Sequence, residues 1–383
     1  MNLDLTKLSI ETELLLLLSR VNPEATALEK SQSYISPAFD WDSFTALSIK
    51  HGTAALIYKN LLKLNAVPQH IIEKFGKIYN NLLRTNILKV YELDRLLDGM
   101  KREGIEVITL KGATASEKIF EDIGVYPSGD IDILVRIEAL DGVRNFLERD
   151  GYKLNDKGFD EYREFFLREL YHINLSNERF TIEPHWNLFL RYFTAPPEFW
   201  WEENMVVSSG GKQQYRFLSP ERNILYTTFR LFFKGFTHLR FLVMVAEVVR
   251  FYRDIVDWEK LFGYARKYRF ENTLRVTLKL CHKLLGAPVP HQYTEIKSLR
   301  AKVLYRRAGE MVFIEEDIHP LNKVLFAFLH DDVTGAVGVL LKRLFPSMGE
   351  IVSRYGLPAG SNKGIIYYIL NPLFLILRKH QKG

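Results

Sequence analysis

The stretch YPSGDIDILV, at residues 126–135, most constrains the fold, because it has the pattern of a buried strand that carries two carboxylates. Side chains alternate between the two faces of a strand, so Asp130 and Asp132 share one face while Ile131 and Ile133 share the other. Two ionised carboxylates this close repel each other unless a cation lies between them. The stretch therefore predicts a sheet with an apolar core on one face and a cation-binding position on the other.

An Asp-x-Asp pair alone is weak evidence, because such pairs often cap a helix or contact solvent. A second segment, VITLKGATASEKIF at residues 107–120, has the pattern of a strand that leads through Lys111 and Gly112 into a helix. Glycine at that turn allows backbone N–H groups to approach a phosphate at the positive end of the helix. Lys111 adds a positive charge near the same phosphates, so the two segments together favour a metal and phosphate site over a solvated strand end.

A third carboxylate comes from FTIEPHW at residues 180–186, where Thr181, Glu183 and His185 share one face of a strand. Glu183 is therefore expected to face the aspartate pair from a neighbouring strand. Mg²⁺ prefers oxygen ligands and often shares them with substrate phosphates. Two such ions, one bound by all three carboxylates and one by the aspartates and a triphosphate, would stabilise the attacking and leaving oxygens of a displacement. Glu183 would also help to deprotonate the attacking hydroxyl.

The rest of the chain is predominantly helical in pattern. Apolar residues recur at helical spacing on both sides of the β-rich middle, over residues 13–19, 41–64, 71–100, 221–234, 238–252, 258–268 and 274–285. Asp40 and Asp257 each precede a tryptophan and a helical pattern, which predicts helix N-caps. We expect three domains: an N-terminal helical domain at 1–98, a core at 99–218 with further strands such as YHINL at 171–175, and a C-terminal helical domain at 219–383.

The motifs L-K-G, S-G-D-I-D-I-L-V and I-E-P-H-W together resemble the uncharacterised bacterial nucleotidyltransferase family of the DNA polymerase β-like superfamily, and the helical flanks resemble it too. The resemblance implies an α+β fold: a polymerase β-like core with a mixed β-sheet between N- and C-terminal helical domains. It also implies an enzyme that uses Mg²⁺ or Mn²⁺ to transfer a nucleoside monophosphate from an NTP, such as ATP, to a hydroxyl of an unknown acceptor, with release of pyrophosphate.

By this resemblance, the paired metal-binding and catalytic aspartates are Asp130 and Asp132, and the third carboxylate is Glu183. Nucleotide binding is assigned to Lys111, Gly112, Ser128 and Gly129. Possible acceptor or supporting residues are His172, His185, Lys234, His238 and Arg240. Histidines in such places are as often structural as catalytic, and a basic helix face is as often solvated as functional.

Two positions depart from the superfamily pattern. Ala113 follows Gly112 where the superfamily has serine or glycine, and Tyr126 stands where relatives often have an arginine. Arg136, Arg163 or Arg168 could supply the guanidinium from elsewhere. The departures motivate an alternative, in which the protein is a catalytically weak scaffold that binds a nucleotide or a partner through the same cleft.

Composition bounds the remaining expectations. The net charge of +6 is spread over 52 basic and 46 acidic residues, so it marks no track for nucleic acid and leaves a small molecule or a protein as the acceptor. Cys281 is the only cysteine, which excludes an intramolecular disulfide and predicts a cytoplasmic protein. The apolar segment 365–377 is too short to span a bilayer, and we expect either a buried helix or a peripheral membrane contact through residues 365–382.

Overall fold

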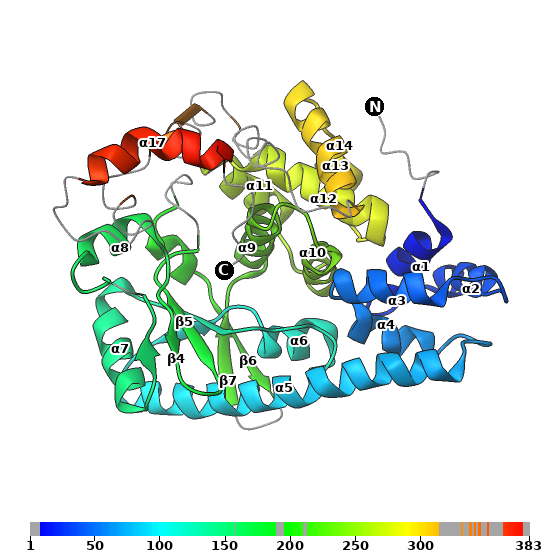
Figure 1. The fold of residues 1–383 in the computed structure, drawn as a ribbon, viewed down its shortest axis with the longest axis horizontal. Helices are drawn as coiled ribbons and strands as arrows, with labels where there is room; N and C mark the ends of the chain where they lie inside the picture. Colours follow the sequence, from blue (N-terminus) through cyan, green and yellow to red (C-terminus); the bar gives the residue numbers. More distant parts are fainter. Residues whose placement is uncertain are drawn as a thin grey trace.

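The computed structural model describes residues 8–156, 158–188, 195–209, 213–313, 331, 337–338, 341, 344–345, 351 and 363–377. A mixed sheet lies within a largely helical molecule (Figure 1). The predicted α+β class, with helices before and after the strands, is confirmed.

The five-stranded sheet has the order β1-β2-β5-β4-β3. Its strands are β1 (Val107–Thr109), β2 (Ile131–Val135), β3 (Lys153–Leu154), β4 (Leu175–Ser176) and β5 (Thr181–His185). Strands β2 and β5 are parallel, whereas the β1–β2, β3–β4 and β4–β5 pairs are antiparallel. The two strands of a separate ribbon, β6 (Met205–Ser209) and β7 (Gln213–Phe217), are antiparallel. The parallel pair matters most, because its register sets Asp132 opposite Glu183.

One apolar core covers the face of β2 opposite the acidic residues. Ile131, Ile133 and Val135 are buried there, as the alternation predicts, together with Leu93, Leu96 and Met100 from α5 (Gln69–Arg102). Figure 1 shows α5 running along the sheet and onward to the N-terminal helices. Other helices next to the strands are α6 (Ala113–Phe120), α7 (Leu140–Arg149) and α8 (Arg163–Glu169).

A second core joins the helices that precede the sheet to those that follow it. The preceding helices are α1 (Ile10–Leu18), α2 (Ala25–Tyr34), α3 (Trp41–Lys50) and α4 (Ala54–Leu61). The following ones are α9 (Pro220–Phe233), α10 (Leu239–Phe251), α11 (Trp258–Lys267), α12 (Glu271–Leu285), α13 (His291–Thr294) and α14 (Leu299–Phe313). Leu14, Phe44 and Ile57 from the first group share one cluster of buried residues with Leu242 and Cys281 from the second. The division into three domains stays a prediction.

Most of the predicted helices are present, and the exceptions have local causes. Asp40 and Asp257 are N-caps, since their carboxylates accept the backbone N–H groups of Ser43 at 2.9 Å and Lys260 at 3.0 Å. The expected helix at 41–64 is two helices, because Gly52 has a φ of 68° and interrupts the helical path. The expected strand at 171–175 is reduced to an isolated bridge at His172 and the two-residue β4.

The apolar C-terminal segment forms α17 (Lys363–Leu377), which continues through Asn371 and Pro372. Asn371 is buried and donates a hydrogen bond from Nδ2 to the carbonyl of Leu344 at 2.9 Å. Ile365, Ile366 and Ile369 are exposed. Within the described part of the chain, no helix is both long enough and apolar enough to cross a membrane. The basic residues after 377 lie outside the described residues, so the peripheral membrane contact stays a prediction.

His51 connects the end of α3 to the start of α10. Its Nδ1 accepts the N–H of Leu239 at 3.3 Å, and its carbonyl accepts the N–H of Arg240 at 3.2 Å. Burial, aided by the charges of Lys50 and His238, lowers the pKa of His51 from 6.5 to about 4. His51 is therefore neutral in the folded protein at pH values where the unfolded chain already binds a proton.

We expect His51 to reduce stability as the pH falls from about 6.5 to about 4, because only the unfolded state gains a proton in that window. Its share of the loss in unfolding free energy is at most roughly 3 kcal/mol. His51→Asn keeps an acceptor near the position of Nδ1 and does not titrate, so its urea unfolding curves should depend less on pH over this range. The matched control is His70→Asn at an exposed histidine. Equal pH dependence in wild type and His51→Asn would contradict the prediction.

Candidate active site

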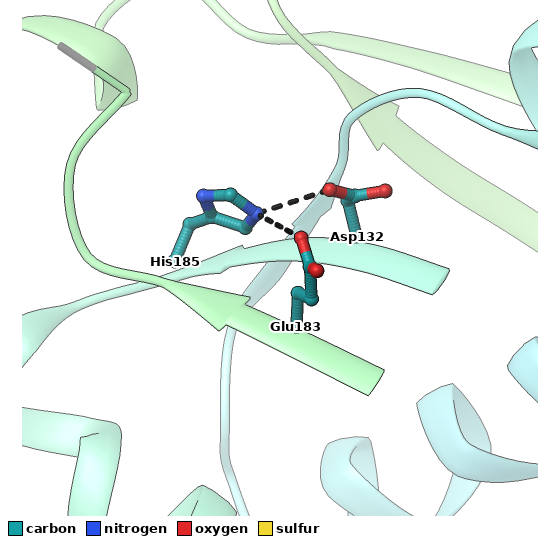
Figure 2. Close-up of side chains that lie close together, drawn as sticks. All are labelled: Asp132, Glu183 and His185. Carbon is teal, nitrogen blue, oxygen red and sulfur yellow. Dashed lines mark hydrogen bonds and ion pairs between the residues drawn. The ribbon is translucent and has the colours of Figure 1, made fainter. Parts of the chain in front are cut away.

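The parallel pairing of β2 and β5 brings three polar side chains together on one face of the sheet. Asp132 on β2 is in register with Glu183 on β5, and His185 follows Glu183 on the same face of β5. Figure 2 shows the three side chains converging. His185 Nε2 lies 3.1 Å from Asp132 Oδ1 and 3.5 Å from Glu183 Oε2. The predicted approach of Glu183 to an aspartate on the neighbouring strand is therefore present.

These three residues have the donor chemistry of a divalent-cation site. One possible ligand atom from each of Asp132, Glu183 and His185 lies within 4.8 Å of the others. The Asp132 and His185 side chains are buried and Glu183 is mostly buried, so water competes weakly for the donors. Carboxylate oxygens suit Mg²⁺ and Mn²⁺, and imidazole is also a common metal ligand. The residues present therefore fit a cation, with His185 in the cluster and Asp130 outside it.

Lys111 neutralises the aspartate pair directly. Its Nζ lies 2.9 Å from Asp130 Oδ1 and 2.8 Å from Asp132 Oδ2. Lys111 follows β1, where the N–H of Leu110 donates to the carbonyl of Asp132 at 3.3 Å. Sequence reasoning placed this ammonium near phosphates, whereas the structure places it between the two carboxylates.

The turn after Lys111 is held against the loop that precedes Asp130. Gly112 is the N-cap of α6 and has a φ of 97°, a conformation that favours glycine. Ser128 packs against it, and the Ser128 hydroxyl donates to the carbonyl of Asp130 at 2.9 Å. Lys89 of α5 donates to the carbonyl of Ser128. Gly129 has open space around it. The structure thus has Gly112 and Ser128 in contact beside Asp130, with Gly129 between Ser128 and Asp130 in the chain.

Helix α9 forms the opposite wall of the cleft and contributes Arg230, which sequence reasoning missed. Arg230 Nη1 lies 3.8 Å from Asp132 Oδ1 and donates to the Tyr226 hydroxyl at 3.2 Å. Lys234 lines the same cleft, as do the rings of Phe229 and Phe233. Lys234, the C-cap of α9, was a candidate, and Arg230 is four residues before it in the last turn of the helix. That i, i+4 relation puts both on one helix face and was the available signal.

The arginines proposed from sequence as replacements for a guanidinium lie elsewhere. Arg136 lies 3.7 Å from Glu106, Arg163 pairs with Asp141 at 2.8 Å, and Arg168 pairs with Glu169 at 2.9 Å. None of these three lines the cleft. Tyr126 is buried and packs against Phe120 with ring centroids 5.2 Å apart.

The remaining predicted residues divide between the cleft and its surroundings. His172 lines the cleft and stacks on His185 with ring centroids 4.8 Å apart. His238 and Arg240 are not among the lining residues; Arg240 packs against Gly52. Trp186 is buried in the core on the other face of the sheet, and its indole N–H donates to the carbonyl of Leu167 at 3.2 Å.

The environment separates the acid strengths of the carboxylates. Burial alone would raise the pKa of Asp132, but Lys111, His185 and Arg230 hold it well below its usual range. Burial raises the pKa of Glu183, and the charges of Asp132 and Asp130 add to that effect. Asp132 is therefore suited to remain charged beside a cation, whereas Glu183 is suited to accept a proton.

Carboxylates, a lysine and an arginine therefore surround the parallel strand pair of this α+β fold. Residues 37–286 match the model of a family described as "Uncharacterised nucleotidyltransferase". The chain therefore belongs to that family, as its motifs predict. No curated protein and no solved structure matches the chain.

We expect Gly112→Ala to lower the free energy of unfolding by about 2 kcal/mol, because alanine is strained at this φ. A Cβ there would also lie 2.8 Å from Ser128 Oγ, which donates a hydrogen bond to the carbonyl of Asp130. Gly129→Ala is the matched control in the same site, since a Cβ at Gly129 has no neighbour within 4 Å. Urea unfolding followed by circular dichroism measures both changes. A Gly112→Ala variant as stable as Gly129→Ala would show that the turn is less constrained than described.

Proposed function

We propose that the protein transfers a nucleoside monophosphate from an NTP to a hydroxyl of an acceptor and releases pyrophosphate. The observation that carries the proposal is the register of β2 and β5, which sets Asp132 opposite Glu183 beside Lys111 and Arg230. Membership of a nucleotidyltransferase family supports the same chemistry. The acceptor class, a small molecule or a protein, and the base of the nucleotide stay open.

In the proposed reaction, the acceptor oxygen attacks the α-phosphorus of the NTP. A new phosphorus–oxygen bond forms, and the bond from the α-phosphorus to the oxygen bridging to the β-phosphate breaks. Pyrophosphate leaves with that electron pair, and Glu183 takes the proton of the acceptor hydroxyl. Burial raises the pKa of Glu183, which suits it to this role.

The cleft supplies charge for the phosphates from several directions. Arg230 and Lys234 on α9 would bind phosphate oxygens as negative charge develops on pyrophosphate. Asp132, Glu183 and His185 would hold Mg²⁺ or Mn²⁺, which offsets phosphate charge and polarises the reacting oxygens when bound. Positioning and charge neutralisation of this kind account for most catalysis in phosphoryl transfer.

The first test compares wild type with Asp132→Asn in pyrophosphate release from each of the four NTPs, with Mg²⁺ or Mn²⁺ and a cell extract as acceptor source. We expect the variant to lose activity by at least about 100-fold, because the carboxylate that contacts Lys111 and His185 loses its charge. Asp160→Asn, at an exposed carboxylate paired with Arg144, should retain activity.

Equal turnover by wild type and Asp132→Asn would contradict the proposal. Metal-dependent nucleotide binding by the wild type, without pyrophosphate release from any NTP, would instead favour the scaffold. Thermal melting of both variants separates loss of activity from loss of fold.

A second prediction concerns Arg230, which takes the place of the arginine expected near the aspartates. Arg230→Ala should lower kcat/KM by about 10- to 1,000-fold, because the charge that faces Asp132 and the phosphates is lost. Arg168→Ala removes an exposed arginine from outside the cleft and should leave kcat/KM unchanged. Equal effects of the two substitutions would show that Arg230 has no role in the reaction.

A further inference from the structure

The two oxygens of the Asp132 carboxylate face two different nitrogen groups. Oδ2 lies 2.8 Å from Lys111 Nζ, which also lies 2.9 Å from Asp130 Oδ1. Oδ1 lies 3.1 Å from His185 Nε2, next to Glu183. The site thus contains one position between the two aspartates and another between Asp132, Glu183 and His185. The first position is where an Asp-x-Asp pair would otherwise require a cation.

The backbone on both sides of Lys111 is fixed, which holds its side chain at the first position. Leu110, just before it, is tied to β2 by the hydrogen bond from its N–H to the carbonyl of Asp132. Gly112, just after it, is fixed against Ser128 at the start of α6. The Lys111 side chain is only 17% exposed, and Asp132 is fully buried. Moving the ammonium away would leave a buried carboxylate without its main counter-charge, which is strongly unfavourable.

The second position offers ligands for a metal ion. Asp132, Glu183 and His185 bring two carboxylates and an imidazole within 4.8 Å of one another, whereas Asp130 is not in this group. Among divalent ions, Mn²⁺ accepts carboxylate oxygens readily and also binds imidazole nitrogen. The His185 ring is buried and stacks on Tyr171 and His172. Burial and stacking together restrict its rotation.

We propose that this protein binds one divalent cation at Asp132, Glu183 and His185, and that the Lys111 ammonium takes the place of a second cation between Asp130 and Asp132. The cation site belongs to the same active site, and its role in catalysis rests on the proposed nucleotidyl transfer. It replaces the two-ion arrangement expected from the sequence, in which all three carboxylates bind metal. Charge for the phosphates then comes from one metal ion together with Lys111, Arg230 and Lys234.

Counting bound Mn²⁺ in the absence of nucleotide tests this arrangement. Titration followed by the electron paramagnetic resonance signal of free Mn²⁺ should give one ion per chain for wild type. Lys111→Met removes the ammonium and keeps a long side chain, so Asp130 and Asp132 become available and the count should rise to two. The matched control is Lys234→Met, which removes a lysine that lines the same cleft and should leave the count at one.

Two further variants assign the ligands and do not depend on the folding of Lys111→Met. His185→Phe keeps a stacking ring without nitrogen, and it should weaken Mn²⁺ binding by at least about tenfold. Asp130→Asn should bind Mn²⁺ within about threefold of wild type, because Asp130 contacts Lys111 and is not in the cation cluster. Thermal melting verifies that each variant is folded.

Three results would overturn the inference: two ions on wild type, an unchanged count in folded Lys111→Met, or a loss of Mn²⁺ binding in Asp130→Asn larger than in His185→Phe. No measurement in this series uses turnover. A protein that binds one Mn²⁺ as described but releases no pyrophosphate would contradict the proposed function alone. An active enzyme with two ions on wild type would contradict only the assignment of Lys111.

Discussion

The ion pairs of Lys111 with Asp130 and Asp132 are the interaction on which the rest of the site depends. Three carboxylates meet on one face of the sheet, and their mutual repulsion would oppose the pairing of β2 with β5 without a nearby positive charge. Lys111 provides that charge from the turn that follows β1, the other neighbour of β2. Because a partly buried ammonium and a buried carboxylate each lose hydration, each is stable there chiefly because of the other.

The second constraint is the core shared by the helices on both sides of the sheet. It joins α9 and α10 to the N-terminal helices in one cluster of buried residues, and the end of α9 brings Arg230 and its C-cap Lys234 to the cleft. His51 adds a polar connection at the same junction through Leu239 and Arg240. The geometry of the cleft therefore depends on helices that precede and follow the strands, and not on the sheet alone.

The sequence predicted most reliably what depends on local periodicity. Alternation placed Asp132 opposite the core residues Ile131 and Ile133, and helical spacing with Asp257 as N-cap located α11 closely. Prediction from the sequence failed where contacts between distant residues determine the structure. The break at Gly52 requires a positive φ that apolar spacing does not reveal, and Arg230 reaches Asp132 only through the packing of α9 across the cleft.

The guanidinium that faces Asp132 reaches it through tertiary packing and not from the loop before the aspartates. Tyr126 is buried against Phe120, which stabilises the loop before the aspartates, and Arg230 brings a positive charge to Asp132 from a helix about a hundred residues later in the chain. A charge on the loop would move with the strand, whereas one on α9 moves with the helical flank. Any shift of α9 relative to β2 therefore changes the distance between Arg230 and the carboxylates. In this chain the charge of the site is coupled to the packing of its helical flank.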